Sequence, residues 1–347
     1  MLERTRYRDS AGAFSFDRLA CLRNEYAHND CSLCLEQCAH NAFVIREGKW
    51  RLDEASCTQC GACIGACPTN ALSLYGFSLE EAKQKVFKEE KISLTCKDSL
   101  PCLGAFSVEV WSVLLLEGKK NLSCFMGECK GCEHNKDGRV EAAIVQRVNE
   151  ANALVQLLGA EGAISLSYQK EEEKSSRRAF FQRFLAPPKI SEDAPMAPLF
   201  SLKKALKQSL EKELLVQALL SFIYQKKIDD SCTNCKECVQ FCPTQALSYD
   251  SAQTKILFQM GKCIGCRICE DICKPKSIHS FNEAFDMVDF AYDTAKVLVS
   301  HDLQVCLTCK CAFSYKGGAK ICDRCERFEK EHAEFFTLAS DFPSGAL

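Results

Sequence analysis

The sequence contains no long hydrophobic run. Its longest strongly apolar stretch, residues 111–116, is far shorter than the roughly 20 residues that a transmembrane helix needs. Residues 1–20 have neither the apolar core and small-residue cleavage site of a secretory signal nor a twin-arginine pair. These absences predict a cytoplasmic protein without a transmembrane segment, which could still dock on the inner face of a membrane complex.

The sequence also lacks an excess of either charge. Its 44 Lys and Arg residues nearly balance 46 Asp and Glu residues, for a net charge of −2. This balance argues against a nucleic-acid partner and against a strongly basic membrane patch. No glycine-rich phosphate loop, Ser/His/Asp set or flavin fingerprint is present. The chain therefore offers no motif of a substrate site.

Cysteine, in contrast, is abundant, with 26 residues in a chain of 347. Disulfide frameworks belong to small secreted domains, whereas repeated Cys-x2-Cys triplets belong to metal sites. Three complete Cys-x2-Cys-x2-Cys-x3-Cys runs begin at Cys57, Cys232 and Cys263. A fourth run is incomplete and reads Cys31-x2-Cys34-x3-Cys38. This repeated spacing predicts iron–sulfur clusters.

In paired runs of this kind, three cysteines surround one cluster and the fourth reaches the cluster of the other run. This crossed arrangement predicts three complete ligand sets, which are Cys232, Cys235, Cys238 and Cys273; Cys263, Cys266, Cys269 and Cys242; and Cys57, Cys60, Cys63 and Cys38.

The remaining N-terminal cluster has only Cys31, Cys34 and Cys67 from the runs. Its fourth ligand is left open between Cys21, His28 and no ligand, the last giving a [3Fe–4S] cluster. Both pairs of runs resemble the bacterial two-[4Fe–4S] ferredoxin family, over about a third of the chain. The resemblance implies four [4Fe–4S] clusters, with [3Fe–4S] as the alternative for one.

Five cysteines lie between the two ferredoxin-like modules, and the last of them, Cys132, is the odd one. The segment 124–129, Cys-Phe-Met-Gly-Glu-Cys, resembles the C-x-x-G-x-C segment of the delta subunit of methyl-viologen-reducing hydrogenase. Lys130 and Gly131 depart from that family's pattern. The resemblance implies an electron-relaying subunit with a [2Fe–2S] site at Cys96, Cys102, Cys124 and Cys129. Structural zinc and metal-free thiols are the alternatives.

Two further Cys-x2-Cys pairs, at Cys306 and Cys309 and at Cys322 and Cys325, flank a stretch that contains Gly317-Gly318. Two such knuckles on facing hairpins deliver four thiolates to one ion, which predicts a zinc ribbon. Rubredoxin-type iron uses the same geometry, but no glycine follows either knuckle. Cys311 is left outside this set.

The predicted fold is a multidomain α+β protein. We expect β-hairpins at 42–52 and 246–258, and between them a small α/β domain with strands near 91–95, 121–124 and 161–168 and helices at 103–117 and 139–158. The predicted segments are a ferredoxin-like module (1–78), the α/β domain with five cysteines (79–185), a linker (186–200), an amphipathic helix (201–228), a second ferredoxin-like module (229–285) and a zinc-ribbon-like domain (286–347).

These features predict an iron–sulfur subunit that relays electrons between a low-potential donor and a partner oxidoreductase, such as a dehydrogenase, a hydrogenase or a heterodisulfide-reductase-like complex. The alternative is a redox sensor or a maturation factor for a metalloenzyme. A third hypothesis is an enzyme that binds a substrate at a cluster lacking its fourth cysteine.

Overall fold

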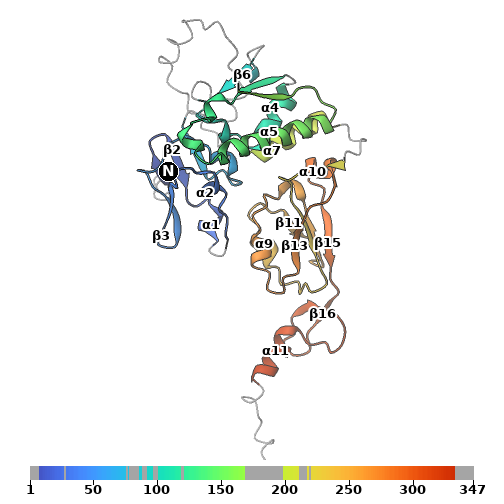
Figure 1. Ribbon diagram of the computed structural model, residues 1–347. Helices are drawn as coiled ribbons and strands as arrows, with labels where there is room; N and C mark the ends of the chain where they lie inside the picture. Colours follow the sequence, from blue (N-terminus) through green and yellow to red (C-terminus); the bar gives the residue numbers. More distant parts are fainter. Residues whose placement is uncertain are drawn as a thin grey trace, which may run out of the picture. The chain divides into compact units, whose positions relative to one another are not determined.

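The computed structural model describes residues 8–26, 29–75, 77, 86–87, 92–96, 101–118, 121–168, 198–210, 217–218 and 220–332. The chain divides into two compact units (Figure 1). Unit 1 comprises Met1–Gln225, Met260–Ile268 and Asn282–Thr294, and unit 2 comprises Lys226–Gln259, Cys269–Phe281 and Ala295–Leu347. Within the described ranges, no helix is both long and apolar enough to cross a membrane.

The first part of unit 1 consists of two small antiparallel sheets and short helices. One sheet has the order β1-β2-β5 and the other is the hairpin of β3 and β4. The turn Glu47-Gly48 has positive φ at both residues, as a two-residue hairpin turn requires. This hairpin confirms the prediction for 42–52. The elements are β1 (Arg8–Ala11), β2 (Phe14–Asp17), α1 (Leu22–Glu25), α2 (Leu33–Gln37), β3 (Phe43–Arg46), β4 (Lys49–Leu52), η2 (Ile64–Ala66) and β5 (Leu72–Leu74).

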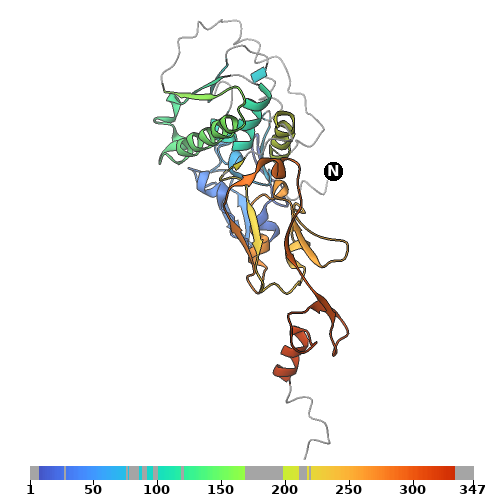
Figure 2. The same cartoon turned by 90° about the vertical axis from the view of Figure 1, so that its right-hand side faces the viewer.

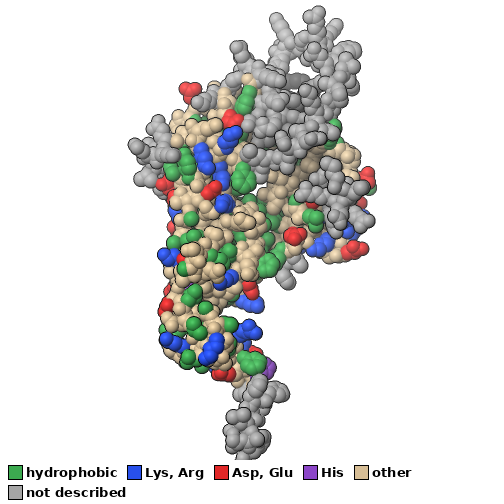
Figure 3. Space-filling view, turned by 180° about the vertical axis from the view of Figure 1, so that it is seen from behind, with side chains coloured by type: hydrophobic (Ala, Val, Ile, Leu, Met, Phe, Trp, Pro, Cys, Tyr) green, Lys and Arg blue, Asp and Glu red, His purple; other side chains and the backbone are tan. Residues whose placement is uncertain are grey.

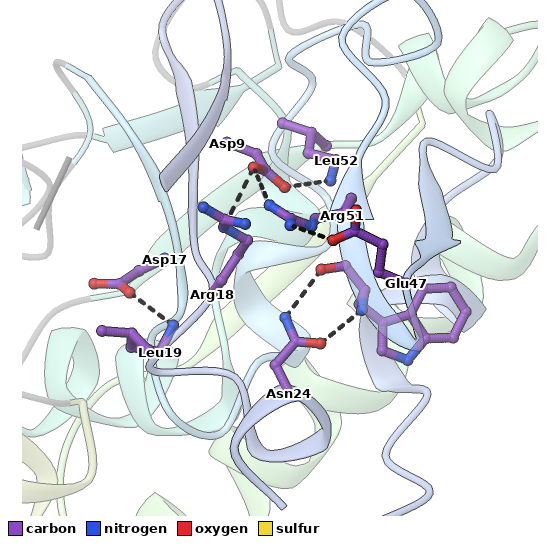
Figure 4. Close-up of polar contacts among 9 residues, drawn as sticks. Asp9, Asp17, Arg18, Leu19, Asn24, Glu47, Arg51 and Leu52 are labelled. Atoms are coloured by element: carbon purple, nitrogen blue, oxygen red, sulfur yellow. Dashed lines mark hydrogen bonds and ion pairs between the residues drawn. The ribbon is translucent and has the colours of Figure 1, made fainter. Parts of the chain in front are cut away.

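Polar contacts hold the two sheets together (Figure 4). The carboxylate of Asp9 in β1 accepts a hydrogen bond from the Leu52 backbone N–H at 2.9 Å. The same carboxylate pairs with Arg18 at 3.4 Å and with Arg51 at 3.7 Å. The Asn24 amide binds both the N–H and the C=O of Trp50, at 2.6 and 2.9 Å. The apolar core beneath contains Phe14, Phe16, Phe43 and Leu72.

The next part of unit 1 contains a parallel sheet with the order β6-β7-β8. Helix α4 connects the first two strands and packs between helix α5 and helix α7 (Pro198–Ser209) (Figure 2). Because it is covered on both sides, it carries eight buried residues, including Trp111. The elements are β6 (Ile92–Thr95), η3 (Leu103–Ala105), α4 (Val108–Gly118), β7 (Leu122–Phe125), η4 (Gly127–Cys129), η5 (Glu133–Asn135), α5 (Arg139–Leu157) and β8 (Ile164–Ser167).

The predicted elements of this part are found, with one difference. The helix expected over 103–117 is split into the short turn η3 and helix α4, which begins only at Val108. The split exists because Phe106 is in an extended conformation between them. Helix α5 ends at Leu157, close to the predicted stop, and Gly159 has the positive φ typical of a helix terminus.

The prediction of one amphipathic helix over 201–228 is wrong, because the helix found there is much shorter. Helix α7 covers only Pro198–Ser209, and Gln225–Ile228 forms strand β10, which pairs with β13 (Ile278–Phe281). Gln225 and Lys226 are buried in that strand, and Lys226 contacts Ser280 through its ammonium group at 2.6 Å. Tertiary pairing therefore overrides the helical spacing. Residues 186–197 of the predicted linker lie outside the described residues.

The remaining elements include a three-stranded antiparallel sheet with the order β11-β12-β15, whose first two strands confirm the hairpin predicted for 246–258. Strands β16 and β17 form a further hairpin. The elements are β9 (Gln217–Ala218), α8 (Glu237–Gln240), β11 (Leu247–Tyr249), β12 (Lys255–Phe258), η6 (Met260–Lys262), α9 (Ile268–Asp271), β14 (Phe285–Asp286), α10 (Met287–Ala291), β15 (Lys296–Ser300), β16 (Leu303–Val305), β17 (Ala312–Ser314) and α11 (Asp323–His332).

Candidate metal centres

The cysteine runs share a backbone conformation at the residues that flank or follow their cysteines. In each complete run, the residues on both sides of the second cysteine have positive φ, and in all four runs so does the third residue after the last cysteine. The flanking pairs are Gln59 and Gly61, Asn234 and Lys236, and Gly265 and Arg267, and the third residues are Asn41, Asn70, Gln245 and Lys276.

This conformation turns backbone N–H groups toward sulfur. After Cys38, the left-handed Asn41 lets the Ala42 N–H donate to the Cys38 Sγ at 3.4 Å. After Cys273, the Ser277 N–H donates to the Cys273 Sγ at 3.3 Å. Donors of this kind stabilise a thiolate and help to set the reduction potential of a cluster. The loops are therefore shaped for anionic sulfur.

The first predicted set, Cys38, Cys57, Cys60 and Cys63, forms one electrostatic group. Burial raises the pKa of the Cys63 thiol, and the negative charges of Cys60, Cys34, Cys38 and Cys57 raise it further. Buried thiols that raise one another's pKa need added positive charge to ionise together. Iron ions supply that charge, so these residues fit a cluster.

The second N-terminal group contains Cys21. Burial raises the pKa of the Cys34 thiol, and the charges of Cys67, Cys21 and Cys31 add to this effect. Cys21 directly precedes α1. Burial raises the pKa of the Cys31 thiol, and the charges of Cys67 and Cys21 also raise it. The structure thus brings Cys21 to the three cysteines that lack a partner in the sequence runs. His28 lies outside the described residues.

In unit 2, Cys232, Cys235, Cys238 and Cys273 line one cavity. Burial raises the pKa of Cys238 to about 12, and the charges of Cys232, Cys235 and Cys273 contribute. His301 lies beside this group, with 3.7 Å between its Nε2 and the Cys232 Sγ. The set of Cys242, Cys263, Cys266 and Cys269 rests on sequence spacing and stays a prediction.

The middle cysteines share Cys96 as a neighbour. A hydrogen bond to Cys96, followed by burial, raises the pKa of the Cys102 thiol. Burial raises the pKa values of Cys124 and Cys129, and the charge of Cys96 raises them further. The Leu103 N–H donates to the Cys96 Sγ at 3.3 Å. Cys132 is half-buried, and its charge contributes to the raised pKa of Cys129. This grouping is compatible with a metal site but does not identify the metal.

The middle cysteines lie directly against the first cysteine group. A Cβ atom on Gly65 would lie 2.6 Å from the Gly104 carbonyl oxygen and 2.7 Å from that of Phe106. Arg147 fixes the same loop, because its Nη1 donates to the Gly104 oxygen at 2.9 Å and to the Phe106 oxygen at 3.3 Å. The charge of Cys60 also raises the pKa of Cys102. The two thiol groups are therefore neighbours within unit 1.

The C-terminal cysteines form the tightest group. The sulfur atoms of Cys306, Cys309, Cys322 and Cys325 all lie within 4.8 Å of one another, and those of Cys309 and Cys322 are 3.7 Å apart. Tetrahedral ligands at a Zn–S distance of about 2.3 Å are about 3.8 Å apart. The residues therefore fit a single tetrahedral ion.

The second knuckle differs from the predicted hairpin, because Cys322 directly precedes helix α11 and Cys325 lies in its first turn. Asp323 and Glu326 favour this helix start through its dipole. The first knuckle does follow a hairpin strand, β16. Cys311 is exposed and is not in the four-sulfur group.

Sequence reasoning missed several residues beside these groups. Asn29 and His301 are the clearest, and neither belongs to a recognised motif. An Asn two residues before a cysteine is a local turn signal, which could have drawn attention to Asn29. The contact of His301 depends on the fold and has no signal in the sequence.

The repeated loops and converging thiols define an iron–sulfur protein with ferredoxin-type modules. Residues 29–71 and residues 225–274 each match a 4Fe-4S dicluster domain, so the chain contains two such domains and the two-module prediction is confirmed. Archaeal-type glutamate synthases [NADPH] of Thermotoga maritima and Thermotoga sp. strain RQ2 are 32% identical to the chain over 71 residues, which are 20% of this chain. That match spans 14% of the length of each synthase.

Proposed function

We propose that the chain is an electron-transfer subunit that connects a low-potential donor with a partner oxidoreductase. The observation that carries this proposal is the presence of two 4Fe-4S dicluster domains whose cysteines converge in groups. The similarity to two glutamate synthases supports an oxidoreductase context. On the face shown in Figure 3, basic and acidic side chains are interspersed, which suits a protein partner of mixed charge.

The residues proposed to hold four [4Fe–4S] clusters are the four cysteine sets described above, with Cys21 completing the set of Cys31, Cys34 and Cys67. When bound, such clusters supply one-electron transfer at potentials tuned by hydrogen bonds and burial. The protein contributes thiolates, backbone donors such as the Ala42 N–H, and a surrounding core that limits access of water.

We further propose a [2Fe–2S] site at Cys96, Cys102, Cys124 and Cys129 and a structural zinc ion at the C-terminal quartet. The adjacency of Cys102 to the Cys60 group supports a redox role for the middle site. The 3.7 Å sulfur separation between Cys309 and Cys322 supports a single ion in the quartet.

Anaerobic purification followed by stepwise reduction tests the proposal. We expect the electron paramagnetic resonance (EPR) spectrum to show several reducible clusters, and affinity capture from the native host to recover a redox enzyme. A protein that contains iron but cannot be reduced, or that contains no iron, would contradict an electron-transfer role.

A further inference from the structure

One buried side chain joins the cysteine motifs of the two dicluster domains. Asn29 is 3% exposed and belongs to the first domain. Its Oδ1 accepts a hydrogen bond from the Cys31 N–H at 3.1 Å, and its Nδ2 donates to the Cys266 carbonyl oxygen at 2.7 Å. Cys31 and Cys266 are both proposed cluster ligands, and Met260–Ile268 belongs to the same compact unit as Asn29.

A second contact fixes the same segment. Tyr224 packs so closely against Gly265 that a Cβ atom there would lie 2.4 Å from ring atoms. Gly265 also has a φ of +68°, which glycine tolerates best. Burial raises the pKa of the Tyr224 phenol, and the charges of Glu109, Cys263, Glu150 and Cys31 raise it further. The Tyr224 side chain therefore lies near cysteines of both domains.

Both contacts hold the two motifs at a fixed separation without a charged group. A buried Asn side chain that uses its acceptor on one loop and its donor on the other is satisfied only when both loops are in place. Loss of the side chain leaves two buried backbone groups without this partner. The arrangement thus has the properties of a positioning device rather than of a surface contact.

We propose that Asn29 is the positioning residue of an electron-transfer junction between the Cys31 motif and the Cys266 motif. This inference rests on the proposed function and deepens it, because it assigns where an electron passes from one dicluster domain to the other. One domain loses one electron and the other gains it, and no bond is made or broken. Tyr224 and Gly265 complete the packing at the junction.

The test compares full-length Asn29→Ala and Asn29→Asp with a matched control, Asn24→Ala. Asn24 is also buried, at 7% exposure, and also makes two backbone hydrogen bonds, but both go to Trp50 within the first module. Asn29→Asp keeps an acceptor for the Cys31 N–H and removes the donor to Cys266. Iron content, spin count after full reduction, and EPR line broadening and microwave power saturation are measured anaerobically.

We expect N29A and N29D to keep the iron content and spin count of the wild type but to lose part of the magnetic coupling between clusters. N24A should keep this coupling. Unchanged magnetic coupling in both Asn29 variants would overturn the proposed electron-transfer junction. Loss of iron in both, with iron retained in N24A, would also overturn it, because Asn29 would then act in cluster assembly. A wild-type protein without reducible clusters would instead refute the proposed function itself.

Discussion

Replacing Cys322 with serine should abolish zinc binding at the C-terminal end of the chain. Serine keeps the backbone N–H that donates to the Cys306 Sγ at 3.4 Å, but it supplies no thiolate. The structure provides a close control in Cys311→Ser, since Cys311 is exposed and lies two residues after the ligand Cys309. The two variants therefore separate loss of a ligand from loss of a thiol.

The loss of structure should be large, because little apart from the zinc ion stabilises this segment. Among residues 301–332, only Cys306 and Cys322 are buried, so the segment has no apolar core of its own. Structural zinc contributes about 10–16 kcal/mol in comparable small sites. This far exceeds the roughly 0.3–1 kcal/mol that a favourable charge at a helix end contributes. Loss of the ion should therefore unfold both the hairpin and α11.

The assay is metal analysis of the full-length protein together with circular dichroism. We expect about one zinc ion per chain in the wild type and in C311S, and almost none in C322S, with iron content equal in all three. Backbone donors from Cys309 and Cys322 lower the pKa of Cys306 to about 6. Protons compete with zinc for the thiolates, so zinc should be retained at neutral pH and released on acidification. Equal zinc in C322S and C311S would refute the four-thiolate site.

Four further predictions concern the rest of the chain. Cys21→Ser should convert one [4Fe–4S] signal to [3Fe–4S] in the EPR spectrum of the oxidised protein, and an unchanged spectrum would exclude Cys21 as a ligand. Gly65→Ala places a methyl group 2.6 Å from the Gly104 oxygen, and should cost about 1–3 kcal/mol, measured as a lower unfolding temperature; an unchanged temperature contradicts the contact. Asp293→Asn removes the partner of Lys203, whose side chain is 5% exposed, and should cost about 3–5 kcal/mol in denaturant unfolding, while a negligible loss would contradict a buried ion pair. His301→Ala should lower the potential of the Cys232 site in a redox titration if the imidazole donates to sulfur, and an unchanged potential would exclude that role.

The sequence was most informative where spacing alone determines chemistry. The Cys-x2-Cys-x2-Cys-x3-Cys runs predicted both dicluster domains, and hydrophobic patterns predicted the two hairpins and the strands β6, β7 and β8. Prediction failed where contacts between residues far apart in the sequence determine the structure. Gln225–Ile228 is a strand because β13 lies beside it, and no local signal distinguishes it from a helix end. Asn29 carries a local turn signal, but its contact with Cys266 was not predictable because the two residues lie 237 positions apart.

The left-handed residues of the cysteine loops have a consequence for how the protein matures. Eight of these positions are not glycine. Three are Asn, which tolerates this conformation, and the other five each cost about 1–2 kcal/mol. A total of roughly 5–10 kcal/mol is comparable with the whole stability of an ordinary domain, which is about 5–15 kcal/mol. Newly synthesised chains should therefore not hold these loops closed before iron and sulfide arrive. Cluster insertion then becomes the last step of folding, and cellular iron supply would determine how much of the chain reaches its final structure.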